Sequence, residues 1–125
     1  MIRDSSQEYN TTPVPEATDA TGLIDLETLE RVAPIIRNVA HPLRLRILDY
    51  LDQFDEPRRV SDIVAAAGAG QAVVSQQLRI LKDQGVLSAR REGSYVRYAI
   101  AERSVLLLLD CIRHHRQGRP PERSQ

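Results

Sequence analysis

The stretch GQAVVSQQLRILKDQG, Gly70 to Gly85, predicts a short helix whose two sides differ in chemistry. Val74, Leu78 and Leu81 recur at the i, i+4, i+7 spacing of a stripe that faces a protein core. The other side carries small, amide and cationic side chains, and its single acid comes almost at the end. These outward residues are Gln71, Ala72, Ser75, Gln76, Arg79 and Lys82. An ordinary solvated face would be mostly Glu and Lys, so this side needs another explanation.

Bulk composition restricts the possible classes of protein. A chain of 125 residues with 42% apolar and 27% charged residues supports one domain. Its apolar run Val105–Leu109 is far too short to span a bilayer, and no basic-then-apolar leader opens the chain. We therefore expect a soluble, cytoplasmic protein without a membrane partner. One cysteine excludes an internal disulfide framework and a cysteine-based zinc cage.

The zero net charge hides a strong asymmetry along the chain. Residues 1–57 hold five arginines and eleven carboxylates, a net charge of −6, whereas residues 58–125 carry +6. This division is typical of a basic portion that meets a polyanion, with the acidic portion kept away from it. Charge chemistry that serves solubility alone would give the same division.

The order of elements follows from periodicity and helix-end signals. Residues 1–22 resemble a disordered tail, residues 23–116 form the domain, and residues 117–125 form a flexible tail. Asp25 is placed to cap a first helix, in which Pro34 predicts a kink or a division into two helices. His41-Pro42 starts the next helix, and FDEPRR is predicted to be a loop. A helix over residues 61–67, burying Ile63 and Val64, ends before a glycine turn.

Two short β-prone runs after residue 85, VLSARR and YVRYAI, predict a hairpin around a glycine-containing turn. The last helix, ERSVLLLLDCIRHHRQG, is apolar almost all round. A domain of this size cannot cover such a helix by itself, so a second copy of the chain is expected to cover it. The predicted fold class is mainly α with a small β-hairpin, a dimeric winged helix-turn-helix with about five helices and a two-stranded wing.

This architecture explains the unusual outward side of the helix at residues 71–83. A recognition helix lies in the major groove, where glutamine, serine and arginine side chains bond base edges and phosphates. Arg90, Arg91 and Arg97 fall on the hairpin, where a wing meets the neighbouring backbone or minor groove. We therefore predict a sequence-specific regulator of transcription that binds a double-stranded DNA operator. The alternative is a winged-helix module that contacts proteins without specific DNA binding.

The runs AHPLRLRILDYL, VSDIVAAAG, QAVVSQQLRILKDQGVL and RREGSYVRYAI resemble the ArsR/SmtB family of bacterial winged-helix repressors. The resemblance covers roughly residues 26–112. It implies operator binding that an inducer relieves, and a homodimer paired through the first and last helices. The residues expected at that interface are Leu29, Val32, Ile36, Val105, Leu108, Leu109 and Ile112.

Family resemblance also bears on the inducer. Metal-sensing relatives carry cysteines in the third helix, where this chain has VSDIVAAAG. Asp110, His114 and His115 on the last helix are weak metal candidates, because the family's Asp-x-His spacing is broken and a second pair is missing. We therefore expect no cofactor, with a metal ion as the less favoured possibility. Cys111 is a weak redox candidate through a disulfide between two copies. No pattern in the sequence identifies the effector.

An enzyme finds no support in the sequence. The chain has no glycine-rich phosphate loop, no nucleophile and base at useful spacing and no cluster of buried carboxylates. No catalytic residue is predicted.

Overall fold

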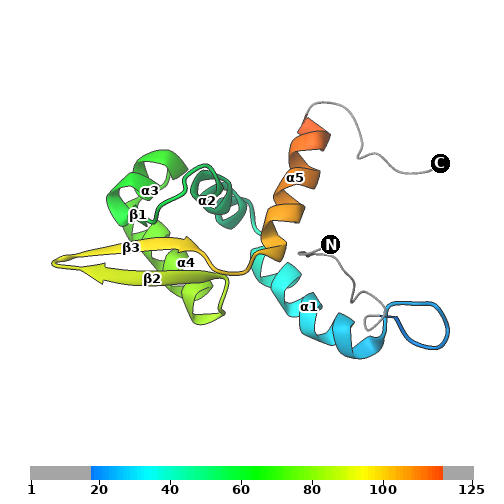
Figure 1. The fold of residues 1–125 in the computed structure, drawn as a ribbon. Coiled ribbons are helices and arrows are strands. Elements are labelled where there is room, and N and C mark those ends of the chain that lie inside the picture. Colours follow the sequence, from blue (N-terminus) through cyan, green and yellow to red (C-terminus); the bar gives the residue numbers. More distant parts are fainter. Residues whose placement is uncertain (1–17, 117–125) are drawn as a thin grey trace, which may run out of the picture. The chain divides into compact units, whose positions relative to one another are not determined.

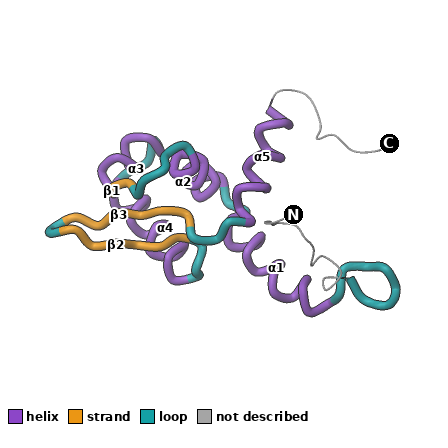
Figure 2. The backbone as a smooth tube through the Cα atoms, in the orientation of Figure 1, coloured by secondary structure: helices purple, strands orange, loops and turns teal. Residues whose placement is uncertain are grey.

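The computed structural model describes residues 18–116. The chain divides into two units, residues 1–37 and residues 38–125, and each is described by itself. Figures 1 and 2 show the five helices and the three strands in chain order. The predicted tails over residues 1–17 and 117–125 lie outside the described residues.

The first unit holds a turn and most of helix α1, Leu26–Val39. Thr18 pairs with Ile24 in an isolated bridge, so the last residues of the predicted tail form a hydrogen-bonded turn. The carboxylate of Asp25 accepts hydrogen bonds from the backbone N–H (3.1 Å) and hydroxyl (2.8 Å) of Thr28, which confirms the predicted cap. These bonds hold the pKa of Asp25 below its usual range, the hydroxyl contributing most.

Pro34 does not divide α1, so of the two predicted alternatives, a kink or a division into two helices, the division is wrong. A proline inside a helix removes the N–H that would bond the carbonyl four residues earlier. That carbonyl belongs to Glu30, an exposed residue whose carbonyl can bond water instead. The helix therefore continues through the proline.

The second unit contains the helix-turn-helix. Helix α2 spans Pro42–Asp52, α3 spans Val60–Ala67 and α4 spans Gln71–Asp83. Gly68 ends α3 in the left-handed conformation (φ 73°), which an L side chain adopts only with strain, and this allows the sharp turn into α4. The three helices pack on one another through side chains with 5% or less of their surface exposed: Ile47, Leu48, Leu51, Ile63, Val74, Leu78 and Leu81.

Helix α3 differs from its prediction in two details. It begins at Val60, one residue earlier than expected. Ile63 is buried as predicted, whereas Val64 is only half-buried. Adjacent helical residues point about 100° apart, so one of the two faces the core and the other lies at its edge.

The predicted hairpin is confirmed, and it belongs to a three-stranded antiparallel sheet. Strands β2, Leu87–Glu92, and β3, Tyr95–Ile100, pair across a turn at Gly93 (φ 62°), as Figure 2 shows. Strand β1, Arg58–Arg59, pairs with the other edge of β3, which gives the order β1-β3-β2. The prediction of a loop over FDEPRR is therefore wrong at its last two residues. A two-residue strand is too short to produce an alternating pattern.

Helix α5, Ser104–Arg116, places part of its apolar surface inward. Val105 and Leu109 are only 2% and 3% exposed. They were predicted to contact a second copy, but they belong to the core of their own protomer and have almost no surface left for a partner. Leu107, which the prediction omitted, is 74% exposed. Within residues 18–116, no helix is long and apolar enough to cross a membrane.

Candidate nucleic-acid interface

Helix α4 has the two faces that the sequence predicts. Val74, Leu78 and Leu81 are fully buried against the rest of the second unit. The side chains at i, i+4 and i+7 on the opposite face, starting at residue 72, are exposed. Of the predicted DNA contacts on this helix, one is half-buried, Ser75, and five are exposed: Gln71, Ala72, Gln76, Arg79 and Lys82.

The outward amide and guanidinium groups of α4 are available for binding. Among residues 18–116, neither Gln76 nor Arg79 has a side-chain hydrogen bond or ion pair. The neighbouring Gln77 has a different role, because its Oε1 accepts a 2.6 Å hydrogen bond from Nε of Arg44. Arg44 also donates to the carbonyl of Asn38 (2.8 Å). Gln77 therefore helps to hold α4 on α2, while Gln76 projects away.

Val73 is a surface residue of α4 that the sequence analysis did not assign. Val73 is 47% exposed and directly follows the outward Ala72. An exposed valine on a recognition helix can contact the methyl group of thymine. Its exposure could have been read from the helical period, which places it next to the outward face rather than in the core stripe.

The three hairpin arginines are not equally available. Arg90 and Arg97 stand opposite one another across β2 and β3. Glu92 accepts a 2.6 Å bond from Nε of Arg97 and lies 3.4 Å from Arg90. This pairing, chiefly with Arg97, holds the pKa of the Glu92 carboxyl below its usual range. Arg91 is exposed and has no ion-pair partner within residues 18–116.

Arg97 also donates to the carbonyl of Pro57 (3.4 Å), so its guanidinium fixes the sheet rather than projecting into solvent. Only 30% of its side chain is exposed, against 62% for Arg90. Of the predicted wing contacts, Arg91 is the most available and Arg97 the least.

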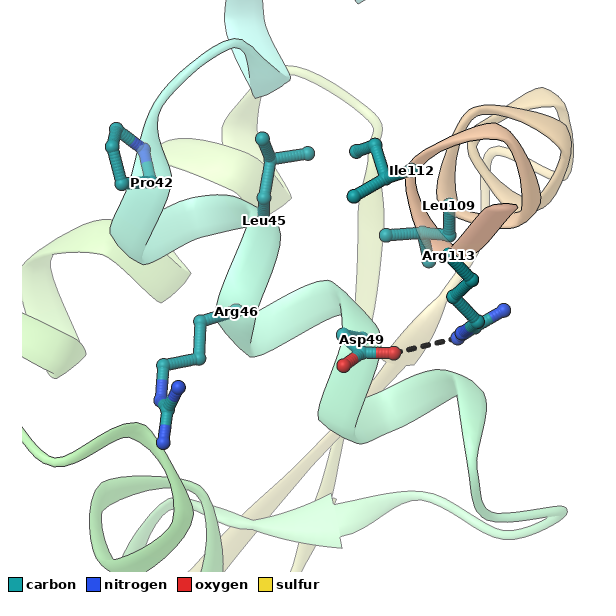
Figure 3. Close-up of a pocket in the computed structure, with 7 residues that line it drawn as sticks. All are labelled: Pro42, Leu45, Arg46, Asp49, Leu109, Ile112 and Arg113. Carbon is teal, nitrogen blue, oxygen red and sulfur yellow. Dashed lines mark hydrogen bonds and ion pairs between the residues drawn. The ribbon is translucent and has the colours of Figure 1, made fainter. Parts of the chain in front are cut away.

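A groove between α2 and α5 is closed at one end by an ion-pair cluster (Figure 3). Arg113 donates to the carboxylates of Asp49 (2.6 Å), Asp52 (2.9 Å) and Asp110 (3.0 Å). The first two residues lie on α2, so this arginine ties α5 to α2. The two α2 carboxylates, Asp49 first, raise the pKa of Arg113 above its ordinary value.

The weak metal candidates on α5 are not assembled into a metal site. The Asp110 carboxylate is bonded to Arg113, and Nδ1 of His114 lies 2.9 Å from the Asp110 carbonyl oxygen, within its own helix. His115 is exposed nearby. No group of three or more His, Cys, Asp or Glu side chains within residues 18–116 could hold a metal ion. Cys111 is exposed and unpaired there.

Comparison with known proteins identifies a family. Residues 41–89 match the family model described as bacterial regulatory protein, arsR family. The chain is 34% identical over 92 residues to the HTH-type transcriptional regulator NmtR of Mycobacterium tuberculosis, covering 74% of this chain and 75% of that protein.

Solved structures give the same result. The homodimeric winged helix-turn-helix domain of a possible ArsR-family regulator from Mycobacterium bovis superposes with a TM-score of 0.61 and 31% identity, over 78% of this chain and 93% of that chain. The AntR antimony-specific transcriptional repressor gives a TM-score of 0.69 and 27% identity, over 90% of this chain and 100% of that chain. All these relatives are described as transcription regulators. They support DNA binding over the alternative of a module that only contacts proteins.

Proposed function

The chain belongs to the arsR family of bacterial regulatory proteins, which are DNA-binding regulators of transcription with a winged helix-turn-helix fold, and from that premise we propose that it is a homodimeric repressor. In this proposal α4 of each protomer enters the major groove of one operator half-site. The hairpin contacts the adjacent backbone or minor groove. No catalytic residue is assigned.

The observation that carries the proposal is the outward face of α4, where neither Gln76 nor Arg79 has a side-chain partner among residues 18–116. Gln76 lies at its centre and can offer a donor and an acceptor together to the edge of adenine, and Arg79 can bond guanine bidentately. Ala72 permits close approach of the helix. The two remaining exposed residues and the half-buried serine supply further polar contacts: Gln71, Ser75 and Lys82. On the hairpin, Arg91 is the main contact, and Arg90 and Arg97 are secondary because Glu92 pairs with both.

Exposed apolar side chains on α1 and α5 support pairing of two copies. On α1, Leu29 and Ile36 are 43% and 53% exposed, and on α5, Leu107 and Ile112 are 74% and 41% exposed. Apolar surface of this extent is covered in a soluble protein when a second chain packs on it. Half-buried Val32 and Leu108 lie at the edges of these surfaces. The M. bovis relative is described as homodimeric.

We propose that any effector of this protein acts without a metal ion bound by the residues of α5. One relative is described as an antimony-specific transcriptional repressor, so a metalloid is the effector to test against the side chains of this chain. Within residues 18–116 the side chains do not fit one, because the Asp110 carboxylate is engaged by Arg113 and no group of three metal-ligating side chains is assembled there. Exposed Cys111 is the more favourable candidate for a chemical signal, since modification there would alter the surface of α5.

Selection of bound duplexes from a random pool tests the proposed function. We expect an inverted repeat whose half-sites are centred about 10 base pairs apart, because a two-fold dimer presents its recognition helices one helical turn apart. Selected duplexes without any common sequence would contradict the proposal. Recovery of a single, unrepeated half-site would support sequence-specific DNA binding but would contradict binding as a homodimer.

A further inference from the structure

A cleft separates the hairpin tip from the two helices of the helix-turn-helix. It lies between the start of α3, the first two turns of α4 and residues 94–96 of the hairpin, all within the second unit. Six of its lining residues have polar side chains, among them three serines: Arg59, Ser61, Gln71, Ser75, Ser94 and Tyr95. The cleft therefore borders the face of α4 that we propose reads the operator.

Arg59 is the cation of this cleft, and the sheet places it in a row of arginines. Its register partner on β3 is Arg97, which is also the partner of Arg90 on β2, so three arginines cross the three strands at one level. Glu92 pairs with two of them, at 2.6 Å and 3.4 Å. Arg59 has no carboxylate partner among residues 18–116. Its charge is the one that remains uncompensated in the row.

The Tyr95 ring orients Arg59. The guanidinium carbon of Arg59 lies 4.3 Å from the centre of that ring, within the range of a cation–π contact. Stacking uses the face of the guanidinium and leaves the N–H groups at its edge for an acceptor. Tyr95 is 55% exposed, so the pair lies at the surface where a large ligand can reach it.

The rest of the lining also favours an anion. The hydroxyl groups of Ser61, Ser75 and Ser94 can each donate a hydrogen bond. Helices α3 and α4 begin at the cleft with no side-chain cap, so their first backbone N–H groups add partial positive charge beside Arg59. None of the residues between 18 and 116 that line the cleft is acidic.

From these contacts we infer that the cleft binds a phosphate of the DNA backbone, with Arg59 as its charged donor and Tyr95 as the residue that positions Arg59. The inference rests on the proposed function. A duplex whose major groove holds α4 brings a sugar–phosphate strand to the side of α4 that carries Gln71 and Ser75. The bound strand then crosses the cleft between the groove read by α4 and the hairpin. Contacts to phosphate add affinity and carry no sequence information.

Salt-dependent binding of Arg59→Ala tests this inference. Affinities for the selected operator and for a scrambled duplex are measured by fluorescence anisotropy at KCl concentrations from about 50 to about 300 mM. This range gives the slope of log affinity against log salt concentration. Each phosphate contact steepens the slope of log affinity against log salt concentration by about 0.9. This slope corresponds to an affinity about fivefold higher at 0.15 M salt than at 1 M salt. We expect Arg59→Ala to weaken both duplexes by this factor per protomer and to flatten the slope accordingly.

Three further variants separate charge from fold. Arg59→Lys keeps the cation and is expected to keep the wild-type slope, and Tyr95→Ala is expected to weaken both duplexes while Tyr95→Phe does not. Arg103→Ala removes an exposed arginine immediately before α5 that lines a different surface groove, and this variant should leave the slope unchanged. An unchanged slope for Arg59→Ala, in protein that retains the wild-type circular dichroism spectrum, would overturn the inference.

Inorganic phosphate distinguishes a DNA strand from a free anion. At matched ionic strength, phosphate is expected to displace DNA no better than chloride. Displacement by phosphate that Arg59→Ala abolishes would identify a free-anion site and overturn the assignment to the DNA strand. If wild-type protein shows no sequence preference, the proposed function itself fails. If it prefers the operator and Arg59→Ala binds equally well, only the cleft assignment fails.

Discussion

Replacement of Arg113 by methionine is expected to loosen α5 from α2 and destabilise the protein. Arg113 is the residue that bonds both α2 carboxylates, Asp49 at 2.6 Å and Asp52 at 2.9 Å (Figure 3 shows the first). Methionine preserves most of the stem's length and apolar contact but removes the charge. Its effect therefore reports on the ion pairs more than on packing.

The magnitude follows from the exposure of the partners. The side chain of Arg113 is 32% exposed, that of Asp49 44% and that of Asp52 23%. Exposed ion pairs contribute about 0.2–1 kcal/mol each, and hydrogen bonds to charged groups contribute more as water is excluded. Two half-exposed contacts together are worth about 1–2 kcal/mol. The third, to Asp110 at 3.0 Å, joins two residues of α5 and does not tie it to α2.

Urea unfolding at one fixed protein concentration measures this loss, because the stability of a dimer depends on concentration. Arg113→Met, Asp52→Asn and the double variant form a cycle, and we expect a coupling energy of about 0.5–1 kcal/mol between the two side chains. Arg103→Met is the control, since Arg103 is an exposed arginine of the second unit without an ion pair among residues 18–116. A stability of Arg113→Met within about 0.3 kcal/mol of wild type, or no coupling in the cycle, would refute the reasoning.

Three other predictions concern the surfaces. Glu92→Gln should raise affinity for any duplex and steepen the salt slope, because it removes the carboxylate that pairs with two hairpin arginines. Equal or weaker binding would argue against this. Leu107→Glu should give a folded monomer in sedimentation velocity, since its 74% exposed side chain lies outside the protomer core, and a persisting dimer would place the interface elsewhere. Stoichiometric zinc should change operator affinity less than tenfold, about 1.4 kcal/mol of coupling, in wild type and in Cys111→Ser. A larger response that His114→Ala abolishes would contradict this and show that the weak metal candidates on α5 bind metal.

Sequence periodicity was sufficient for α2, α3 and α4, because each of these helices buries regularly spaced apolar side chains. The recognition helix, the glycine turn before it and the hairpin were all predicted, since their signals are local. Strand β1 was not, because two residues carry no period and pair only through the register of a distant strand. Arg59 was consequently taken as a loop residue and assigned no role.

Partners across the fold could not be predicted from spacing alone. The three hairpin arginines look equivalent in sequence, but the register places Glu92 beside two of them and leaves Arg91 unpaired within the described residues. Likewise, a run of five apolar residues on α5 does not reveal which side faces inward. Packing within the protomer buries Val105 and Leu109 and leaves Leu107 exposed.

The ratio of operator affinity to scrambled-duplex affinity in Gln76→Ala tests the central claim, that the outward face of α4 reads bases, most directly. We expect operator binding to weaken by about 1–3 kcal/mol, with loss of preference at one base pair in each half-site and little change on the scrambled duplex. Gln53→Ala, an exposed glutamine after the end of α2, is the matched control and should behave as wild type. An equal loss on both duplexes, or none on either, would show that Gln76 does not read the operator and would contradict the claim.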